Sequence, residues 1–191
     1  MTEEEIKVYL ADSGALLRGH FLLSSGLHSP DYVQCALALK SPHWAGELGA
    51  ALAALWQGAE PEIVVAPAMG GLIIGHEVAR AMGVDFIFTE RENVEMTLRR
   101  GFSLAQGARV LIVEDVFTTG KSTLETADLI EACGAEVIGA LSLINRMGDR
   151  ELRFQHESLV KMELTTYSAE NCALCRGGLP LVKPGSRQVF K

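Results

Sequence analysis

The sequence is poor in basic residues, in long apolar runs and in cysteine, and each shortage argues against a class of protein. Its 191 residues carry 17 basic and 24 acidic side chains, a net charge of −7, so the basic surface typical of nucleic-acid-binding proteins is not expected. Its apolar runs, such as 50–56 and 110–113, fall well short of the ~18 residues that span a bilayer. Only four cysteines are present, and the acidic start of the chain does not resemble a signal peptide, so we expect a cytoplasmic protein rather than a disulfide-rich secreted one.

What remains is the profile of a globular domain. Apolar residues make up 48% and charged residues 21% of the chain, which are ordinary values for a folded protein. The length fits a single domain.

Short apolar segments alternate with helical segments from residue 63 to residue 144. We predict strands at 63–66, 86–88, 109–113 and 137–144, with helices at 72–82 and 122–133 that end at Gly83 and Gly134. This order predicts an α/β fold, a parallel sheet flanked by helices on both faces. Before it, we expect helices at 2–14 and 42–56, strands at 21–24 and 32–35, and a polar loop at 89–108 after the second sheet strand.

Two adjacent carboxylates, Glu114 and Asp115, directly follow the apolar strand 110–113. The turn after them is rich in hydroxyl groups and opens a helix, so its amides and hydroxyls can hold a phosphate. The carboxylates would repel that phosphate unless they face sugar hydroxyls or a metal ion. Gly120-Lys121-Ser122 does not end a P-loop, because that motif requires glycine at position 115, which is Asp.

This string, 110–123, resembles the phosphoribosyl pyrophosphate signature of type I phosphoribosyltransferases. The resemblance implies a five-strand parallel core at roughly 41–159. It also implies a small hood, formed by residues 1–40 with a C-terminal strap at 160–191. Glu114 and Asp115 would then contact the ribose hydroxyls. The 5-phosphate would be wrapped by Val116, Phe117, Thr118, Thr119, Gly120, Lys121 and Ser122.

Other segments indicate the orotate branch of that family. Residues 19–32 are similar to its N-terminal hood, 66–71 to its pyrophosphate-binding loop and 97–102 to the end of its mobile catalytic loop. The resemblance implies a Mg²⁺-dependent reaction that joins orotate to phosphoribosyl pyrophosphate in pyrimidine synthesis. It also implies a homodimer in which the mobile loop reaches the partner's active site.

The resemblance and the residue chemistry together suggest roles for single side chains. Arg91, Arg99 and Arg100 would neutralise the leaving pyrophosphate, although the mixed charges of 90–100 also fit a solvated surface run. Arg146 matches a position that contacts orotate and suits its carboxylate; otherwise it pairs with Asp149 at the surface. Thr118 and Tyr32 would complete the base site, unless Tyr32 only packs inside the hood.

Two other functions stay open from the sequence. One is a phosphoribosyltransferase acting on a purine base, and the other is a regulator that binds phosphoribosyl pyrophosphate without reacting. The second is kept open because Ser24 and Met69-Gly70 stand where family members commonly carry basic residues.

The cysteines and histidines receive no catalytic role. Cys172 and Cys175 have the spacing of a zinc-binding pair, but four ligands are needed and His156 is the nearest preceding histidine, so we expect free thiols or a redox-sensitive pair and assign no metal ligands. We expect Cys35 and Cys133 in the core, and His20, His28 and His43 as capping or surface residues.

Overall fold

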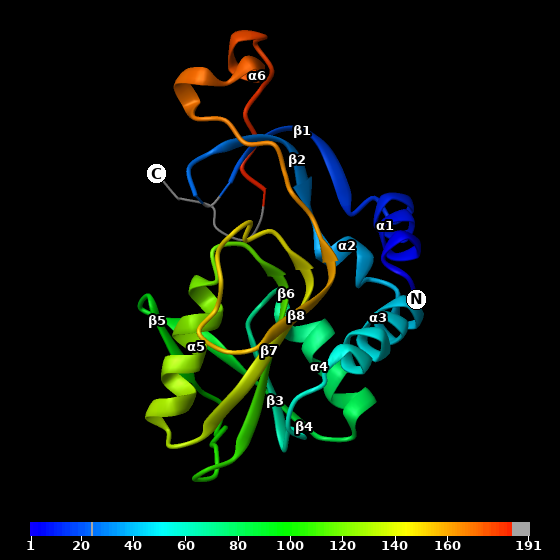
Figure 1. Ribbon diagram of the computed structural model, residues 1–191. Helices are drawn as coiled ribbons and strands as arrows, with labels where there is room; N and C mark the ends of the chain where they lie inside the picture. Colours follow the sequence, from blue (N-terminus) through cyan, green and yellow to red (C-terminus); the bar gives the residue numbers. More distant parts are fainter. Residues whose placement is uncertain (24, 185–191) are drawn as a thin grey trace.

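A computed structural model of the protein describes residues 1–23 and 25–184; Ser24 and the end of the predicted strap, 185–191, lie outside the described residues. The described chain forms one large sheet in the order β5-β4-β3-β6-β7-β8 (Figure 1). Its strands are β3 (Ile63–Pro67), β4 (Asp85–Glu92), β5 (Glu95–Leu98), β6 (Arg109–Phe117), β7 (Glu136–Asn145) and β8 (His156–Lys161). All neighbours pair in parallel except β5, which runs antiparallel to β4. The parallel part therefore has the five strands that the resemblance implied.

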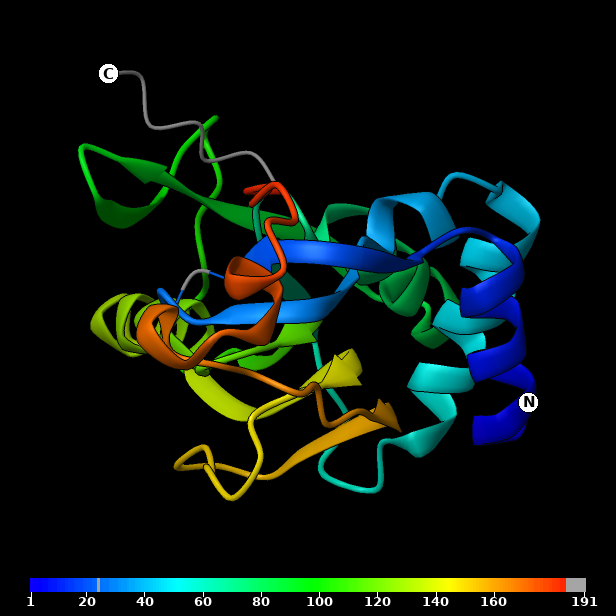
Figure 2. The same ribbon diagram turned by 90° about the horizontal axis from the view of Figure 1, so that it is seen from above.

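Helices cover both faces of this sheet, as Figures 1 and 2 show. On one face, α3 (Pro42–Leu55) and α4 (Gly71–Met82) pack over a cluster that contains Val64 and Leu111. On the other face, α5 (Lys121–Ala132) packs over a second cluster that contains Val65 and Ile112. Successive strand residues thus point to opposite apolar layers, which explains the unbroken apolar strands of the sequence.

Local sequence signals set several helix boundaries. The side chains and backbone of Thr2 and Glu5 form a capping box at the start of α1 (Glu3–Asp12). Pro42 opens α3 at its first turn, and Gly83 ends α4 in the left-handed conformation, with a φ of 71°. The described helices include none that is long and apolar enough to cross a membrane.

The hood hairpin, β1 (Leu16–Leu22) and β2 (His28–Val33), stands apart from the large sheet above the carboxyl ends of its strands (Figure 1). A short helix, α2 (Cys35–Ala38), leads from it to α3. The C-terminal segment, residues 165–184, crosses the hairpin and contains η1 (Ala169–Asn171) and α6 (Ala173–Arg176). The amide of Leu22 donates to the Val182 carbonyl, and the Val182 amide donates to the His20 carbonyl, each over 2.8 Å.

Several sequence expectations were wrong in detail. The loop predicted at 89–108 begins as a hairpin, because β4 continues to Glu92 and pairs with β5. The edge strand β8 was not predicted, and the hood strands lie several residues before the expected 21–24 and 32–35. His20 and His28 are buried rather than at the surface, and Cys133 is exposed rather than in the core; Cys35 is buried and His43 exposed, as expected.

Candidate active site

Glu114 and Asp115 lie near the carboxyl end of β6, in the middle of the sheet. Glu114 is only 8% exposed, and its burial, followed by the neighbouring charge of Asp115, raises its pKa well above the ordinary value. Burial also raises the pKa of Asp115, although its Oδ1 accepts a hydrogen bond of 2.8 Å from the Val116 amide. The site thus holds two closely spaced acids in a place that resists negative charge, which favours a cationic or hydroxyl-rich ligand beside them.

The turn between β6 and α5 surrounds a small cavity. The cavity has a volume of about 50 Å³ and is lined by Glu114, Val116, Phe117, Thr118, Thr119, Gly120, Lys121, Ser122 and Thr123. Gly120 has a φ of 74°, and a Cβ there would come 2.8 Å from Leu152 Cδ2, so the turn requires glycine. The turn opens at the N-terminus of α5, where free amides and the helix dipole favour an anion. Every residue predicted to hold the 5-phosphate therefore lines one hollow.

The loop between β3 and α4 approaches the same two acids. A Cβ on Gly70 would lie 2.5 Å from Asp115 Oδ2, and one on Gly71 would lie 2.9 Å from the Val113 carbonyl oxygen. The Ala68–Met69 peptide bond is cis, and the Met69 side chain is exposed. The backbone of the loop predicted to bind pyrophosphate therefore packs directly against the end of β6. This contact leaves no room for a side chain at Gly70 or Gly71.

The side chains proposed for the base lie around Asp115. The Arg146 amide donates to the Phe117 carbonyl over 2.8 Å, which joins the ends of β7 and β6. Burial, and after it the charge of Asp115, raises the pKa of Tyr32, and Arg146 opposes this effect. The Cys35 thiol lies 4.0 Å from the Asp115 carbonyl oxygen. Tyr32 of the hood, Arg146 directly after β7 and Asp115 of β6 therefore share one electrostatic environment.

Arg146 is largely desolvated. Its burial lowers the pKa of its guanidinium group, and the nearby Tyr32 and Cys35 raise it. Its Nε atom is buried and has no hydrogen-bond partner among the described residues. Among those residues, the ion pairs also include none between Arg146 and Asp149, so Arg146 is not the surface residue that the sequence left as an alternative.

The three arginines predicted for pyrophosphate separate into two groups. Arg91 on β4 pairs with Glu125 of α5, which also pairs with Lys121 over 3.7 Å. The positive charge of Arg91 lowers the pKa of Glu114. Arg99 and Arg100 instead pair with Glu90 of the hairpin, over 3.9 and 3.1 Å. The structure thus brings Arg91 close to the turn between β6 and α5, whereas Arg99 and Arg100 lie away from it. Sequence reasoning missed Glu125, although its position four residues after Lys121 on a helix was a usable signal.

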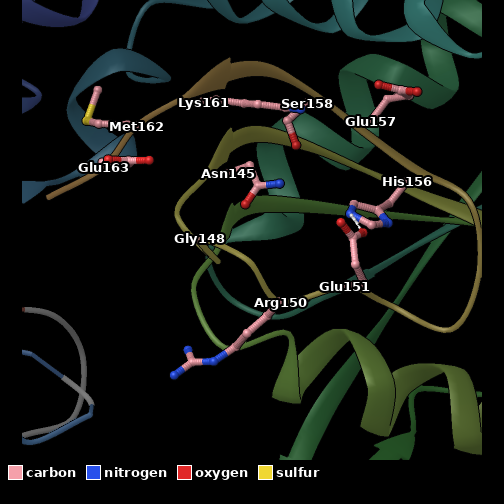
Figure 3. A pocket seen from close by; sticks show the side chains of 10 residues that line it. All are labelled: Asn145, Gly148, Arg150, Glu151, His156, Glu157, Ser158, Lys161, Met162 and Glu163. Carbon is pink, nitrogen blue, oxygen red and sulfur yellow. Dashed lines mark ion pairs between the residues drawn. The ribbon is translucent and has the colours of Figure 1, made fainter.

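A larger cavity of about 260 Å³ lies at the β7–β8 edge and contains none of the predicted site residues (Figure 3). It is lined by Asn145, Gly148, Arg150, Glu151, His156, Glu157, Ser158, Lys161, Met162 and Glu163. Its acids and bases are mixed, and His156 Nε2 lies 3.2 Å from Glu151 Oε2. We place the active site at the smaller hollow, because Glu114 and the N-terminus of α5 line it and because Asp115 and Arg146 lie beside it at the ends of β6 and β7.

Comparison with known proteins agrees with this arrangement. Residues 43–166 match the family model of the phosphoribosyl transferase domain. The chain is 47% identical over 190 residues to an orotate phosphoribosyltransferase of Pelotomaculum thermopropionicum, covering 99% of this chain and 100% of that one. A second, from Desulforamulus reducens, is 46% identical with the same coverage.

A solved structure has the same fold. The orotate phosphoribosyltransferase from Aeropyrum pernix superposes with a TM-score of 0.66 at 25% identity, covering 82% of this chain and 93% of that one. With a family model matching more than half of the chain and relatives of this identity along almost all of it, the chain belongs to the phosphoribosyltransferase family and, within it, to the orotate phosphoribosyltransferases.

Proposed function

We propose that the protein transfers the phosphoribosyl group of phosphoribosyl pyrophosphate to orotate, giving orotidine 5′-phosphate and pyrophosphate. The observation that carries this proposal is the desolvated guanidinium of Arg146, unpartnered at Nε, in the same environment as Asp115 and Tyr32. A buried cation without a full set of acceptors binds a planar carboxylate strongly, because the ligand supplies the missing hydrogen bonds.

Asp115 and Glu114 act on the sugar. In the reaction, the bond from the anomeric carbon to the pyrophosphate oxygen breaks and a bond to the orotate ring nitrogen forms. Positive charge develops on the sugar between these events. Fixed carboxylates beside the ribose stabilise that charge and accept hydrogen bonds from its hydroxyls, while the residues of the α5 turn hold the 5-phosphate.

The donor set of the site fits Mg²⁺. This ion prefers oxygen ligands, and the Glu114 carboxylate lines the same hollow as Thr118 and Thr119, with Asp115 next to it in the chain. When bound with the substrate, the ion supplies positive charge that stabilises the leaving pyrophosphate. Arg91 supplies further positive charge from the chain itself, and the backbone of the 68–71 loop borders the same space.

Orotate lies between the hood and the sheet in this proposal. Arg146 binds its carboxylate, Tyr32 covers a face of its ring and Thr118, whose side chain is exposed at the turn, binds its edge. We also propose that the protein acts as a homodimer in which Arg99 and Arg100 of the β4–β5 hairpin reach the partner's pyrophosphate. We propose the cytoplasm as its location, because both substrates are charged metabolites that do not cross membranes unaided.

The test is a spectrophotometric assay of purified protein with Mg²⁺ and phosphoribosyl pyrophosphate. Orotate, uracil, adenine, hypoxanthine and xanthine are offered separately. We expect consumption of orotate alone, with pyrophosphate released in equal amount. Consumption of a purine would refute the assignment of the base site, and binding of phosphoribosyl pyrophosphate without consumption of any base would favour a regulator.

A further inference from the structure

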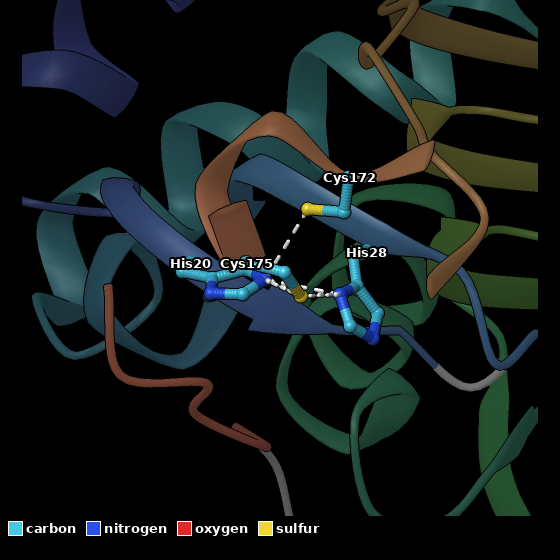
Figure 4. Close-up of side chains that lie close together, drawn as sticks. All are labelled: His20, His28, Cys172 and Cys175. Atoms are coloured by element: carbon cyan, nitrogen blue, oxygen red, sulfur yellow. Dashed lines mark hydrogen bonds between the residues drawn. The ribbon is translucent and has the colours of Figure 1, made fainter. Parts of the chain in front are cut away.

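Four side chains that the reaction does not use meet above the hood hairpin. His20 of β1, His28 of β2, Cys172 and Cys175 offer ligand atoms that all lie within 4.8 Å of one another (Figure 4). His20, His28 and Cys172 are buried, with exposed fractions of 3%, 5% and 0%. Two of the four come from residues 20–28 and two from residues 172–175, so the cluster joins the two ends of the chain.

The spacing of these atoms matches a tetrahedral metal site. His20 Nε2 lies 3.0 Å from His28 Nδ1, 3.5 Å from Cys172 Sγ and 3.7 Å from Cys175 Sγ, and the last of these sulfurs lies 3.3 Å from His28 Nδ1. With zinc bonds of about 2.0–2.1 Å to nitrogen and 2.3 Å to sulfur, ligand atoms on a tetrahedron are about 3.3–3.8 Å apart. The observed separations therefore leave room for an ion at the common centre.

A hydrogen bond prepares His20 to act as a ligand. Its Nδ1 lies 2.8 Å from the Leu179 carbonyl oxygen, which can only accept, so Nδ1 carries the proton. In the neutral ring, Nε2 then has a free lone pair directed at the cluster. Histidine ligands of metals are commonly fixed in this way by a carbonyl or carboxylate behind them. Without a cation, that lone pair would have only weak thiol donors or the other ring to face.

Apart from backbone hydrogen bonds to the hairpin, the C-terminal segment has few contacts that would hold it in place. From residue 169 to residue 183, only Cys172 is buried and only Leu174 is half-buried. α6 has only four residues, and the hairpin beneath it has two strands, which is a marginal unit by itself. Small segments without an apolar core are commonly stabilised by a structural metal.

We propose that His20, His28, Cys172 and Cys175 bind one structural Zn²⁺ that fastens the C-terminal segment to the hood hairpin. Two thiols lose their protons to solvent and bind as thiolates, so the ion and its ligands are neutral overall and can be buried. Thiolate and imidazole ligands favour zinc over Mg²⁺, which prefers oxygen. All four positions are filled by protein, so the site is closed and does not act as a catalytic centre.

The site also has a consequence for the active site. His28 begins β2 and Tyr32 lies on the same strand, so the ion fixes one end of the strand that carries Tyr32. The proposal replaces the sequence expectation of free or redox-sensitive thiols without a metal.

The first test measures metal in the full-length protein, purified with a thiol reductant and without chelators. We expect about one zinc ion per chain by elemental mass spectrometry. The double variant C172S/C175S should contain none, whereas C133S, which removes an exposed cysteine outside the cluster, should keep it. No zinc in the wild type, or equal zinc in the double variant, would overturn the proposal.

A second test uses only the wild type, in case the double variant does not fold. After zinc is stripped under reducing conditions, Co²⁺ is added. We expect a thiolate-to-cobalt charge-transfer band and the ligand-field absorption of a tetrahedral site, both removed by one equivalent of Zn²⁺. The absence of these bands would refute the site, and so would a Cys172–Cys175 disulfide in protein that takes up no metal after its reduction.

A third readout follows the segment itself. Arg176 is exposed in α6, so trypsin cleavage there reports on opening of the segment. We expect cleavage to become about 10-fold faster or more after zinc removal and to return to its original rate when Zn²⁺ is restored. An unchanged rate would contradict the proposed fastening role.

Discussion

The large sheet and the hood are stabilised in different ways. The sheet is covered on both faces by helices, and the apolar side chains in the middle of β3 and β6, residues 64–65 and 110–113, are fully buried in two apolar clusters. The C-terminal part of the hood is mostly exposed and is held by a few backbone hydrogen bonds and a cluster of four polar side chains. The core also includes Val33, so the strand that carries Tyr32 is anchored to the same apolar layer as the sheet. The C-terminal segment lacks such an anchor, since Cys172 is its only buried side chain between residues 169 and 183.

The largest effect should come from breaking the sheet. Leu111 is fully buried in β6, and L111A removes three carbons from its core, so we expect a loss of about 2–5 kcal/mol in the free energy of unfolding. Urea denaturation followed by circular dichroism measures this loss. A loss below about 1 kcal/mol in the free energy of unfolding would show that the core repacks easily. It would weaken the contrast between the sheet and the hood.

Removing one charge at the end of β6 should leave the fold intact and nearly abolish turnover. D115N keeps the size of the side chain, and we expect kcat to fall by about 100- to 1,000-fold, the range for loss of a main electrostatic contact to a transition state. D128N is the matched control, since Asp128 pairs with Arg153 at the surface. Equal activity of wild type and D115N would remove Asp115 from the mechanism.

Substitution of Arg146 should separate the two substrates. For R146A we expect the KM for orotate to rise by about 10-fold or more, as for a lost charge-assisted hydrogen bond of about 1.5–3 kcal/mol. The KM for phosphoribosyl pyrophosphate should change little. R150A serves as control because Arg150 lines the larger cavity of Figure 3. If R150A instead raised the KM for orotate, the base would bind in that cavity.

The buried Glu114 should make stability depend on pH. Its pKa is raised in the folded state, so the folded protein binds more protons than the unfolded chain from about pH 4.5 up to the raised pKa. Stability from this group is therefore present at low pH and is lost as the pH rises through that window. E114Q removes the ionisable group.

We expect E114Q to lose less stability than the wild type in urea denaturation as the pH is raised from about 4.5 through the raised pKa of Glu114. E157Q, at an exposed position, should behave like the wild type. A steeper loss in E114Q than in the wild type would contradict the assignment.

The smallest effect should come from the hood. Leu181 is 43% exposed in the C-terminal segment, so L181A should change the free energy of unfolding by no more than about 0.5 kcal/mol. The measurement is the same denaturation as for L111A. A cost similar to that of L111A would mean that an unseen surface, such as a second copy of the chain, covers this leucine.

Local sequence predicted the parts of the molecule that local interactions determine. The strand, acids, turn and helix at 109–133 are continuous in the chain, so their order could be read directly, although β6 continues beyond the predicted end at 113 through both acids to Phe117. The β8 strand was missed because four of its six residues, His156–Lys161, are polar, so its sequence resembles a loop. The pairing of β4 with β5 was missed for the same reason.

Other features depend on contacts between distant residues. The hood register is set by the pairing of β1 with β2 and with the chain near Val182, which no local pattern records. Cys172 and Cys175 could be recognised as a ligand pair, but His20 lies 152 residues before Cys172. The pairing of Arg91 with Glu125 likewise needed the sheet to be assembled before it could be seen.

That pairing has a consequence for selectivity. Arg91 already has a carboxylate partner in Glu125, which it shares with Lys121. A monovalent anion in solution gains little by displacing a carboxylate that is held in place, since it offers the same charge without the tether. A pyrophosphate group carries several charges and can outcompete it. The ion pair should therefore make Arg91 bind a polyanion in preference to chloride or another monovalent anion.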